Sequence, residues 1–173
     1  MIVTNQENIK VHFAGAENIP HMLCVNAANV KYSLFTVFPF IKSKKKSEDV
    51  KKNSAPSIIE NLSKHCIMDS GLFTLMFGSH KGEQSESFLE AWTDKILKFM
   101  SVNNYKGTYV EVDCQKVLGV NQAWKFRQYM KSKSKNRQIN VFHIEDGQKG
   151  LDRLIEFSDY IALSIPELRI LKK

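Results

Sequence analysis

The chain has 173 residues, 43% hydrophobic and 25% charged, a balance that fits one globular domain with a sizeable core and excludes a disordered tail. Its formal net charge of +7 favours an anionic partner such as nucleic acid. No run approaches the roughly 20 apolar residues that span a bilayer, and the amino terminus lacks a signal-peptide pattern, so we expect a cytoplasmic protein without a membrane partner.

Three cysteines, Cys24, Cys66 and Cys114, lie far apart in the chain, each within apolar sequence. Their odd number and their spacing predict reduced core thiols rather than a disulfide framework. No zinc-binding spacing is present, so the sequence predicts no metal site and no cofactor.

Short apolar runs alternate with longer amphipathic ones, and this pattern predicts strands alternating with helices. The expected strands are Ile9–Ala14, Val30–Phe38 stopped by Pro39, Cys66–Asp69, Thr108–Asp113, Ile139–Ile144 and Tyr160–Ile165. The expected helices are Pro20–Ala28, Pro56 to about Lys64, Glu86–Met100, Gln122–Lys131 and Leu151–Phe157, with one more opening at Pro166. Residues 42–55 are expected to form a basic, flexible loop.

The order of these elements is a strand followed by a helix, about six times, with connections too long for hairpins. Such alternation predicts a parallel sheet with helices outside it, as in a doubly wound sheet or a (β/α)8 barrel. No glycine-rich phosphate-binding fingerprint follows an expected strand, which favours the barrel. A full barrel has about 250 residues. We therefore expect one α/β, TIM-barrel-like domain over residues 1–173 that is incomplete at its carboxyl end.

The clearest chemical signal is the apolar run Cys66–Met68 followed by Asp69-Ser70-Gly71. An aspartate at the tip of a buried strand needs partners to offset its desolvation, and a glycine lets the backbone turn sharply beside a ligand. Parallel α/β proteins gather functional groups at this edge of the sheet. Asp69 is therefore a candidate catalytic residue, and the alternative is that Asp69 and Ser70 only cap a helix or make a turn.

Polar residues also follow the other expected strands and would meet Asp69 at the same edge. Glu17 is a possible site residue or a helix cap, and His143 is a possible site residue or a core histidine. The residues in this wider set are Glu17, Asp113, His143, Glu145 and Ser164.

The fourth expected strand carries two kinds of residue. Tyr109, Glu111 and Asp113 share one face by alternation, whereas Val110 and Val112 share the other. In a barrel the first face could point inward. Several acids at one mouth would then perturb each other's pKa values, which is typical of functional sites and also of structural networks.

Asp69-Ser70-Gly71-Leu72-Phe73 resembles the D-S-G-G-(Y/F) motif of tRNA-guanine transglycosylases, and more closely the D-S-G-A-F form of their phage and bacterial relatives that insert 7-deazaguanine bases into DNA. The segment from Val11 to Glu17 is similar to the H-F-(S/A)-G-A-E segment of the phage proteins. Asn140–His143 and Tyr160–Leu163 are similar to their P-V-F-H and Y-I-A-L-G-G strands. The resemblance covers nearly the whole chain.

This resemblance implies that guanine in a nucleic acid is exchanged for a 7-deazaguanine derivative through a covalent glycosyl-enzyme, on a base that has left the stack. It implies that Asp69 helps to recognise the base and to transfer a proton. Asp113 would read the Watson–Crick edge, because two acceptor oxygens suit the N1–H and N2–H donors of guanine. The remaining residues that it would place around the base are Ser70, Gly71, Phe73, His143 and Ser164.

The chain also departs from the family pattern. The family's nucleophilic aspartate lies beyond the Y-I-A-L-G-G strand, whereas here that strand continues as Ser164-Ile165-Pro166 and the sequence stops at Lys173. We therefore expect the nucleophile to be missing, and a separate carboxyl-terminal piece or a second copy to be a partner. The cysteine and histidine zinc module of the tRNA enzymes is absent as well, which favours DNA over tRNA.

A run of lysines could follow a nucleic-acid backbone or could be only a solvated loop. Its members are Lys42, Lys44, Lys45, Lys46, Lys51 and Lys52. Three alternatives stay open: a fragment of a tRNA-acting enzyme, a nucleic-acid-binding module without catalysis, and an unrelated metal hydrolase. The hydrolase is disfavoured because its usual H-x-H pair is represented only by His12.

Overall fold

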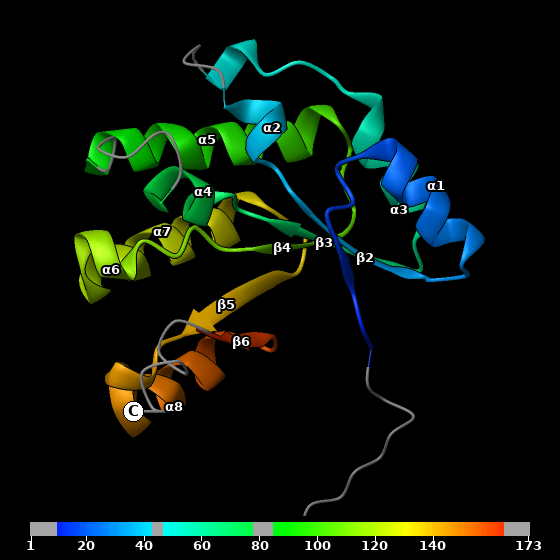
Figure 1. Cartoon of the computed structure of the whole chain (residues 1–173). Helices are drawn as coiled ribbons and strands as arrows, with labels where there is room; N and C mark the ends of the chain where they lie inside the picture. The colour runs from blue at the N-terminus through cyan, green and yellow to red at the C-terminus, as the bar shows by residue number, and fades with distance from the viewer. Residues whose placement is uncertain (1–9, 43–46, 78–84, 165–173) are drawn as a thin grey trace, which may run out of the picture.

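The computed structural model describes residues 10–42, 47–77 and 85–164 (Figure 1). The strands are β1 (Phe13–Ala14), β2 (Tyr32–Thr36), β3 (His65–Asp69), β4 (Thr108–Val110), β5 (Gln138–Phe142) and β6 (Ile161–Leu163). The α-helices are α1 (Ile19–Ala27), α2 (Phe38–Ile41), α3 (Ser54–Leu62), α4 (Leu72–Phe77), α5 (Glu86–Val102), α6 (Gln115–Leu118), α7 (Val120–Lys133) and α8 (Gly147–Phe157). Two short 3-10 helices are η2 (Ser47–Asp49) and η3 (Ile144–Asp146).

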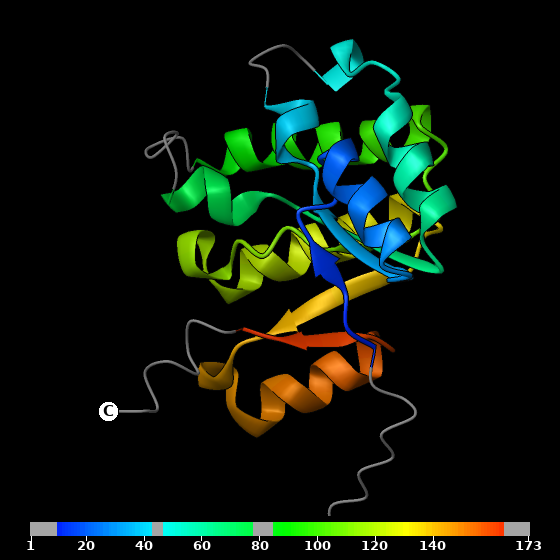
Figure 2. The same cartoon turned by 45° about the vertical axis from the view of Figure 1, so that its right-hand side comes forward.

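The strands form one parallel sheet in which each strand pairs with the next one along the chain, in the order β1-β2-β3-β4-β5-β6. The sheet is curled like part of a barrel, and α8 covers β5 and β6 (Figure 2). The expected parallel α/β fold is confirmed. A doubly wound sheet reverses its strand order at a switch point, whereas this order is sequential, so the architecture is consistent with an incomplete α/β barrel.

Several boundaries differ from those that the sequence predicts. Pro39 does not end a strand, because β2 has already ended at Thr36 and the proline lies in the first turn of α2, where its missing N–H costs nothing. The fourth strand ends at Val110 rather than at Asp113. The sequence also did not predict α2, α4, α6, η2 or η3, and residues 9, 165 and 166 lie outside the part that the structure describes.

The core lies between the sheet and the helices that flank it. Helix α5 begins where the side chain of Ser85 accepts a hydrogen bond from the Phe88 N–H, which satisfies one free donor of the first turn. Its buried positions then repeat at helical spacing, which places them on one side of the helix. They include Leu89, Trp92, Ile96 and Phe99. The apolar periodicity of this segment is therefore a packing signal.

The two faces of β3 have different environments. Cys66 and Met68 belong to the hydrophobic core, whereas Ile67 is buried outside that cluster. Because successive side chains of a strand point to opposite faces, His65 and Asp69 share the face of Ile67. Asp69 therefore ends β3 on the face opposite the core.

The cysteines divide into two classes. Cys66 and Cys114 are buried as expected, and the expectation is wrong for Cys24, which is exposed on α1. Among the helices that the structure describes, none is long and apolar enough to cross a membrane.

Candidate functional site at the carboxyl end of the sheet

Asp69 lies at the carboxyl end of β3, and its Oδ2 accepts a hydrogen bond of 3.0 Å from the Gly71 N–H. Burial raises the pKa of this carboxyl group, and the charge of Glu17 raises it further. The N–H groups of Gly71 and Ser70 and the side chain of Thr36 act in the opposite direction, since they stabilise the ionised form. The balance keeps Asp69 protonated to a higher pH than an ordinary aspartate, as suits a proton-transfer group.

Glu17 and Thr36 bring the ends of two more strands to this point. Thr36 is the last residue of β2 and is paired in register with Asp69. Glu17 follows β1, and its Oε2 accepts a hydrogen bond of 3.3 Å from the Thr36 backbone N–H. The structure therefore joins Glu17 to Asp69 through Thr36, and the residue at the N-cap of α1 is Asn18 rather than Glu17. We call Glu17, Thr36 and Asp69 the Asp69 cluster.

The turn after Asp69 is fixed by contacts on two sides. Gly71 has φ +71°, and a Cβ there would lie 2.8 Å from the Cβ of Phe38 and 3.1 Å from Oγ1 of Thr36. Ser70 is buried, and its carbonyl oxygen accepts a hydrogen bond of 3.0 Å from Nε1 of Trp92. Glycine is therefore required at position 71 by its backbone conformation and by the lack of space.

Phe73 lies in the first turn of α4, directly after this turn, and exposes 66% of its surface. A large aromatic ring that remains this accessible could stack on a planar ligand. The structure thus places Ser70 and Gly71 in the turn that follows Asp69, and Phe73 at the start of α4.

Asp113 and His143 form a second group, from the loops that follow β4 and β5. Oδ1 of Asp113 and Nε2 of His143 are 2.8 Å apart, and the imidazole is only 1% exposed while the Asp113 side chain is 25% exposed. His143 is therefore both a buried histidine and the direct partner of a candidate carboxylate. The hydrogen bond occupies one oxygen of Asp113 and fixes the orientation of the group.

Tyr109 and Glu111 do not share the environment of Asp113, contrary to the sequence prediction. The hydroxyl group of Tyr109 donates a hydrogen bond of 2.8 Å to Oε1 of Gln138 inside the core. Glu111 turns toward α7 and accepts two hydrogen bonds of 2.6 Å from Arg127. The N–H of Glu111 still donates a hydrogen bond of 3.0 Å to the carbonyl oxygen of Ile139, so Tyr109 and Glu111 both face the helix layer. The prediction fails at Asp113, which lies after the alternation has ended and bonds His143 instead.

The ion pair between Glu111 and Arg127 is a feature that sequence reasoning missed. Both side chains are buried, and the carboxylate also accepts hydrogen bonds from the Val141 N–H at 2.7 Å and from Nδ2 of Asn140 at 2.5 Å. Burial raises the pKa of Glu111, and the guanidinium group and the N–H donors oppose that effect. The pair joins β4, β5 and α7, so we assign it to the scaffold. Its sequence signal is an arginine, Arg127, at helical spacing with Ala123, Trp124 and Met130.

Two other candidates lie at the ends of the last strands. The backbone N–H of Ser164 donates a hydrogen bond of 3.0 Å to the carbonyl oxygen of Phe142, which extends the pairing of β6 with β5. Glu145, in η3, forms an ion pair with Lys116 of α6, and both side chains are about half exposed. The structure therefore gives Glu145 a surface partner rather than a place in the Asp69 cluster.

Part of the lysine run lies near this edge of the sheet. Lys42 follows α2, and α2 begins beside Gly71, so the exposed Lys42 side chain comes from an element next to the Asp69 turn. Lys51 and Lys52 are exposed just before α3. Lys44, Lys45 and Lys46 lie outside the described residues. The segment also contains η2, which packs against α5, so it is not entirely irregular.

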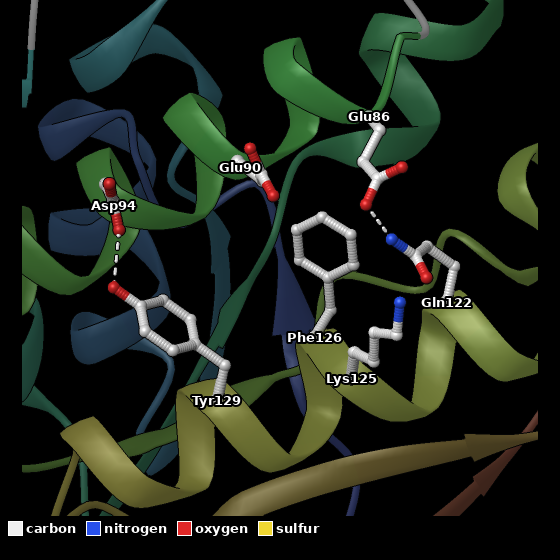
Figure 3. A pocket seen from close by; sticks show the side chains of 7 residues that line it. All are labelled: Glu86, Glu90, Asp94, Gln122, Lys125, Phe126 and Tyr129. Carbon is white, nitrogen blue, oxygen red and sulfur yellow. Dashed lines mark hydrogen bonds between the residues drawn. The ribbon is translucent and has the colours of Figure 1, made fainter.

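A cleft of about 450 Å³ lies in the helix layer, between α5 and α7 (Figure 3). The hydroxyl group of Tyr129 donates a hydrogen bond of 2.9 Å to Asp94 at one end, and Gln122 bonds Glu86 at the other. None of the candidate residues lines this cleft, whose walls are Glu86, Glu90, Asp94, Gln122, Lys125, Phe126 and Tyr129. Within residues 10–42, 47–77 and 85–164, no group of three or more His, Cys, Asp or Glu side chains could hold a metal ion.

Comparisons with protein-family models, with curated proteins and with solved structures find no match. The transglycosylase resemblance therefore rests on short motifs, the most specific of which surrounds Asp69. The hydrogen bond from the Gly71 N–H to Asp69 is also what the turn alternative for Asp69 predicts, so this contact fits both interpretations.

Proposed function

We propose that this chain carries the base-binding half of a base-exchange transglycosylase, in which Asp69 recognises guanine or a 7-deazaguanine and transfers a proton to or from it. The observation that carries the proposal is a carboxyl group of raised pKa at the carboxyl end of β3, within a parallel sheet of sequential strand order. We also propose that the incomplete α/β barrel is part of a TIM barrel. The active sites of TIM barrels lie at the carboxyl ends of the strands, where Asp69 lies.

The chemistry follows from the environment of Asp69. A general acid or base works best when its pKa lies near the working pH, and burial moves that of Asp69 in this direction. The Gly71 N–H holds Oδ2 and thereby fixes the carboxyl group for a planar ligand. Phe73 supplies an accessible ring for stacking, and Asp113 supplies a second carboxylate whose orientation is set by His143.

The proposed substrate is a nucleic acid, with DNA favoured over tRNA. The net charge of +7 and the exposed side chains of Lys42, Lys51 and Lys52 support phosphate contacts. Lys42 is the best placed of these, because α2 begins next to the Asp69 turn.

A complete active centre requires more than the six strands described. β1 and β6 are the open edges of this sheet, whereas a TIM barrel closes with eight strands. The proposal therefore includes a partner that contributes further strands and the nucleophile at these edges, either a separate carboxyl-terminal piece or a second copy. Open strand edges are surfaces on which such a partner could pair.

The test is incorporation of labelled guanine or a labelled 7-deazaguanine into DNA and into tRNA, by this chain alone and together with the product of the downstream reading frame. We expect incorporation into DNA that is lost in Asp69→Asn and retained in Asp152→Asn, which removes an exposed carboxylate of α8. Failure of every mixture to incorporate either base, or equal incorporation by the two variants, would overturn the proposal.

A nucleic-acid-binding module without catalysis is the second candidate, because the exposed lysines do not depend on Asp69. This candidate predicts salt-dependent binding of DNA that Asp69→Asn leaves unchanged, with no base exchange under any condition. Replacement of Lys42, Lys51 and Lys52 by glutamine would weaken binding under either candidate, so the exchange assay decides between them.

A further inference from the structure

Two histidines contact each other at the amino end of the sheet, far from the candidate site along the strands. Nε2 of His12 and Nδ1 of His65 are 2.8 Å apart, and Nε2 of His65 is 3.0 Å from Oγ1 of Thr108. His12 directly precedes β1, whereas His65 begins β3 and Thr108 begins β4. The contact therefore fastens the segment before the edge strand β1 to two inner strands, across β2.

The contact depends on the number of protons that the pair carries. A hydrogen bond between two imidazoles needs one N–H donor and one lone pair, so it forms when both rings are neutral and when one ring is protonated. A second proton removes the last nitrogen lone pair of the contact and leaves two positively charged rings whose facing nitrogen atoms are 2.8 Å apart. The fully protonated pair therefore repels itself, while the neutral pair is stable.

The groups around the pair also oppose its protonation. Burial lowers the pKa of both histidines, and Lys10 lowers both further. Arg137 adds to the effect at His65, and the ring of Tyr32 packs at 5.4 Å from that of His12. Among the described residues, a hydrogen bond to the backbone of Lys10 favours protonation of His12. The surroundings thus stabilise the neutral pair at neutral pH.

Few other contacts hold β1 on the sheet within the part of the chain that the structure describes. The strand has two residues, Phe13 and Ala14, that pair with β2, and the preceding Val11 is 76% exposed. The buried Ala16 adds one hydrogen bond of 3.2 Å, from its N–H to the carbonyl oxygen of Leu34. Three residues after β1, Glu17 reaches the Thr36 N–H in the Asp69 cluster. A change at His12 can therefore reach the candidate site through a very short strand.

We propose that the hydrogen bond between His12 and His65 is a proton-sensitive latch, which holds β1 on the sheet at neutral pH and releases it when both rings are protonated. Release of β1 also withdraws Glu17 from Thr36 and so changes the surroundings of Asp69. The latch stands on the histidine geometry and does not depend on the proposed function.

The test is hydrogen exchange followed by mass spectrometry at about pH 7.5 and about pH 5, the range over which histidine changes its charge, with correction for the intrinsic exchange rate. In the unmodified chain we expect the corrected exchange of peptides covering Phe13–Glu17 to rise by roughly tenfold or more at the lower pH. In His65→Gln the rise should be largely absent, because an amide can bond His12 without becoming charged. His21→Gln removes an exposed histidine of α1 and should behave as the unmodified chain does.

Equal protection of Phe13–Glu17 at both pH values in the unmodified chain would overturn the latch, and so would an undiminished rise in His65→Gln. If that variant does not fold, an NMR titration of the histidine rings in the unmodified chain decides. Two coupled protonation steps for His12 and His65, both with a pKa below the usual histidine value of 6.5, support the latch. Two independent steps at that usual value contradict it.

Discussion

His65 and Asp69 occupy the first and last positions of β3 and project from the same face of the strand, opposite the hydrophobic core. Their separation along the strand is four residues, or about 13 Å. One end of this face carries a histidine pair, and the other carries a partly buried carboxyl group. A single strand thus connects two groups whose charge depends on pH.

The first prediction concerns Asp69→Asn. The folded-state pKa of Asp69 is raised, so the folded chain holds this proton more tightly than the unfolded chain and the ionised side chain destabilises the fold at neutral pH. The neutral isostere should raise the free energy of unfolding at pH 7, and the gain should vanish as the pH falls through the folded-state pKa into the range where Asp69 is protonated. Base exchange should fall by roughly 100-fold to 10,000-fold.

Urea unfolding of Asp69→Asn at several pH values checks the stability, and the exchange assay checks the activity. Asp152→Asn is the control, since its carboxylate is exposed. A variant of Asp69 that is less stable than the unmodified chain at neutral pH would contradict the prediction.

The second prediction concerns Gly71→Ala. A positive φ costs a residue with a side chain about 1–2 kcal/mol, and the added Cβ would also displace Phe38 from a distance of 2.8 Å. We expect lower stability in urea and weaker base binding or exchange per folded molecule. Gly119→Ala also introduces a positive-φ alanine, with no atom within 4 Å of the new Cβ. It should lower stability while leaving function per folded molecule unchanged, and equal functional losses would argue against the site.

The third prediction concerns the buried ion pair. Removal of one partner leaves an uncompensated charge, so Glu111→Leu and Arg127→Met should each destabilise the chain by about 3–5 kcal/mol. The double variant should cost much less than the sum, because no unpaired charge remains. Urea unfolding of the unmodified chain, the two single variants and the double variant completes a double-mutant cycle. Strictly additive costs in the free energy of unfolding would show that the two side chains do not act as a pair.

The fourth prediction concerns the thiols. Burial raises the pKa of Cys66 and of Cys114 to about 12, so almost none of either is thiolate at neutral pH, whereas Cys24 is exposed. A thiol reagent such as Ellman's should modify one cysteine rapidly in the native chain and three after unfolding in urea. The rapid phase should disappear in Cys24→Ser, and its persistence there would show that a buried thiol becomes accessible.

The sequence predicts the fold well because the apolar periodicities are local. The strands, their parallel arrangement and the helix α5 all follow from patterns within about 15 residues. The end of β4 is different: Glu111 keeps the face of Tyr109 and bonds Arg127, which lies sixteen positions further along the chain, whereas Asp113 bonds His143. No local pattern reveals where the alternation stops, so the face of Asp113 could not be assigned correctly.

The sequence predicts only those parts of the candidate site whose signals are local in the chain. Asp69 and Gly71 are recognisable from a buried run that ends in a turn, and the structure gives them the expected places. The link from Glu17 to Thr36 depends on the register of two strands, and the pairing of His12 with His65 depends on strands 53 positions apart. Such contacts are properties of the assembled sheet.

The sequential order of the strands has a consequence for how the chain folds. Every strand pairs with the one before it, so the sheet can grow from its amino end without waiting for distant segments. Glu17, Thr36, Asp69 and Gly71 all belong to β1, β2, β3 and the turns that follow them. On a ribosome, this corner of the molecule could therefore form while β4, β5 and β6 are still being synthesised.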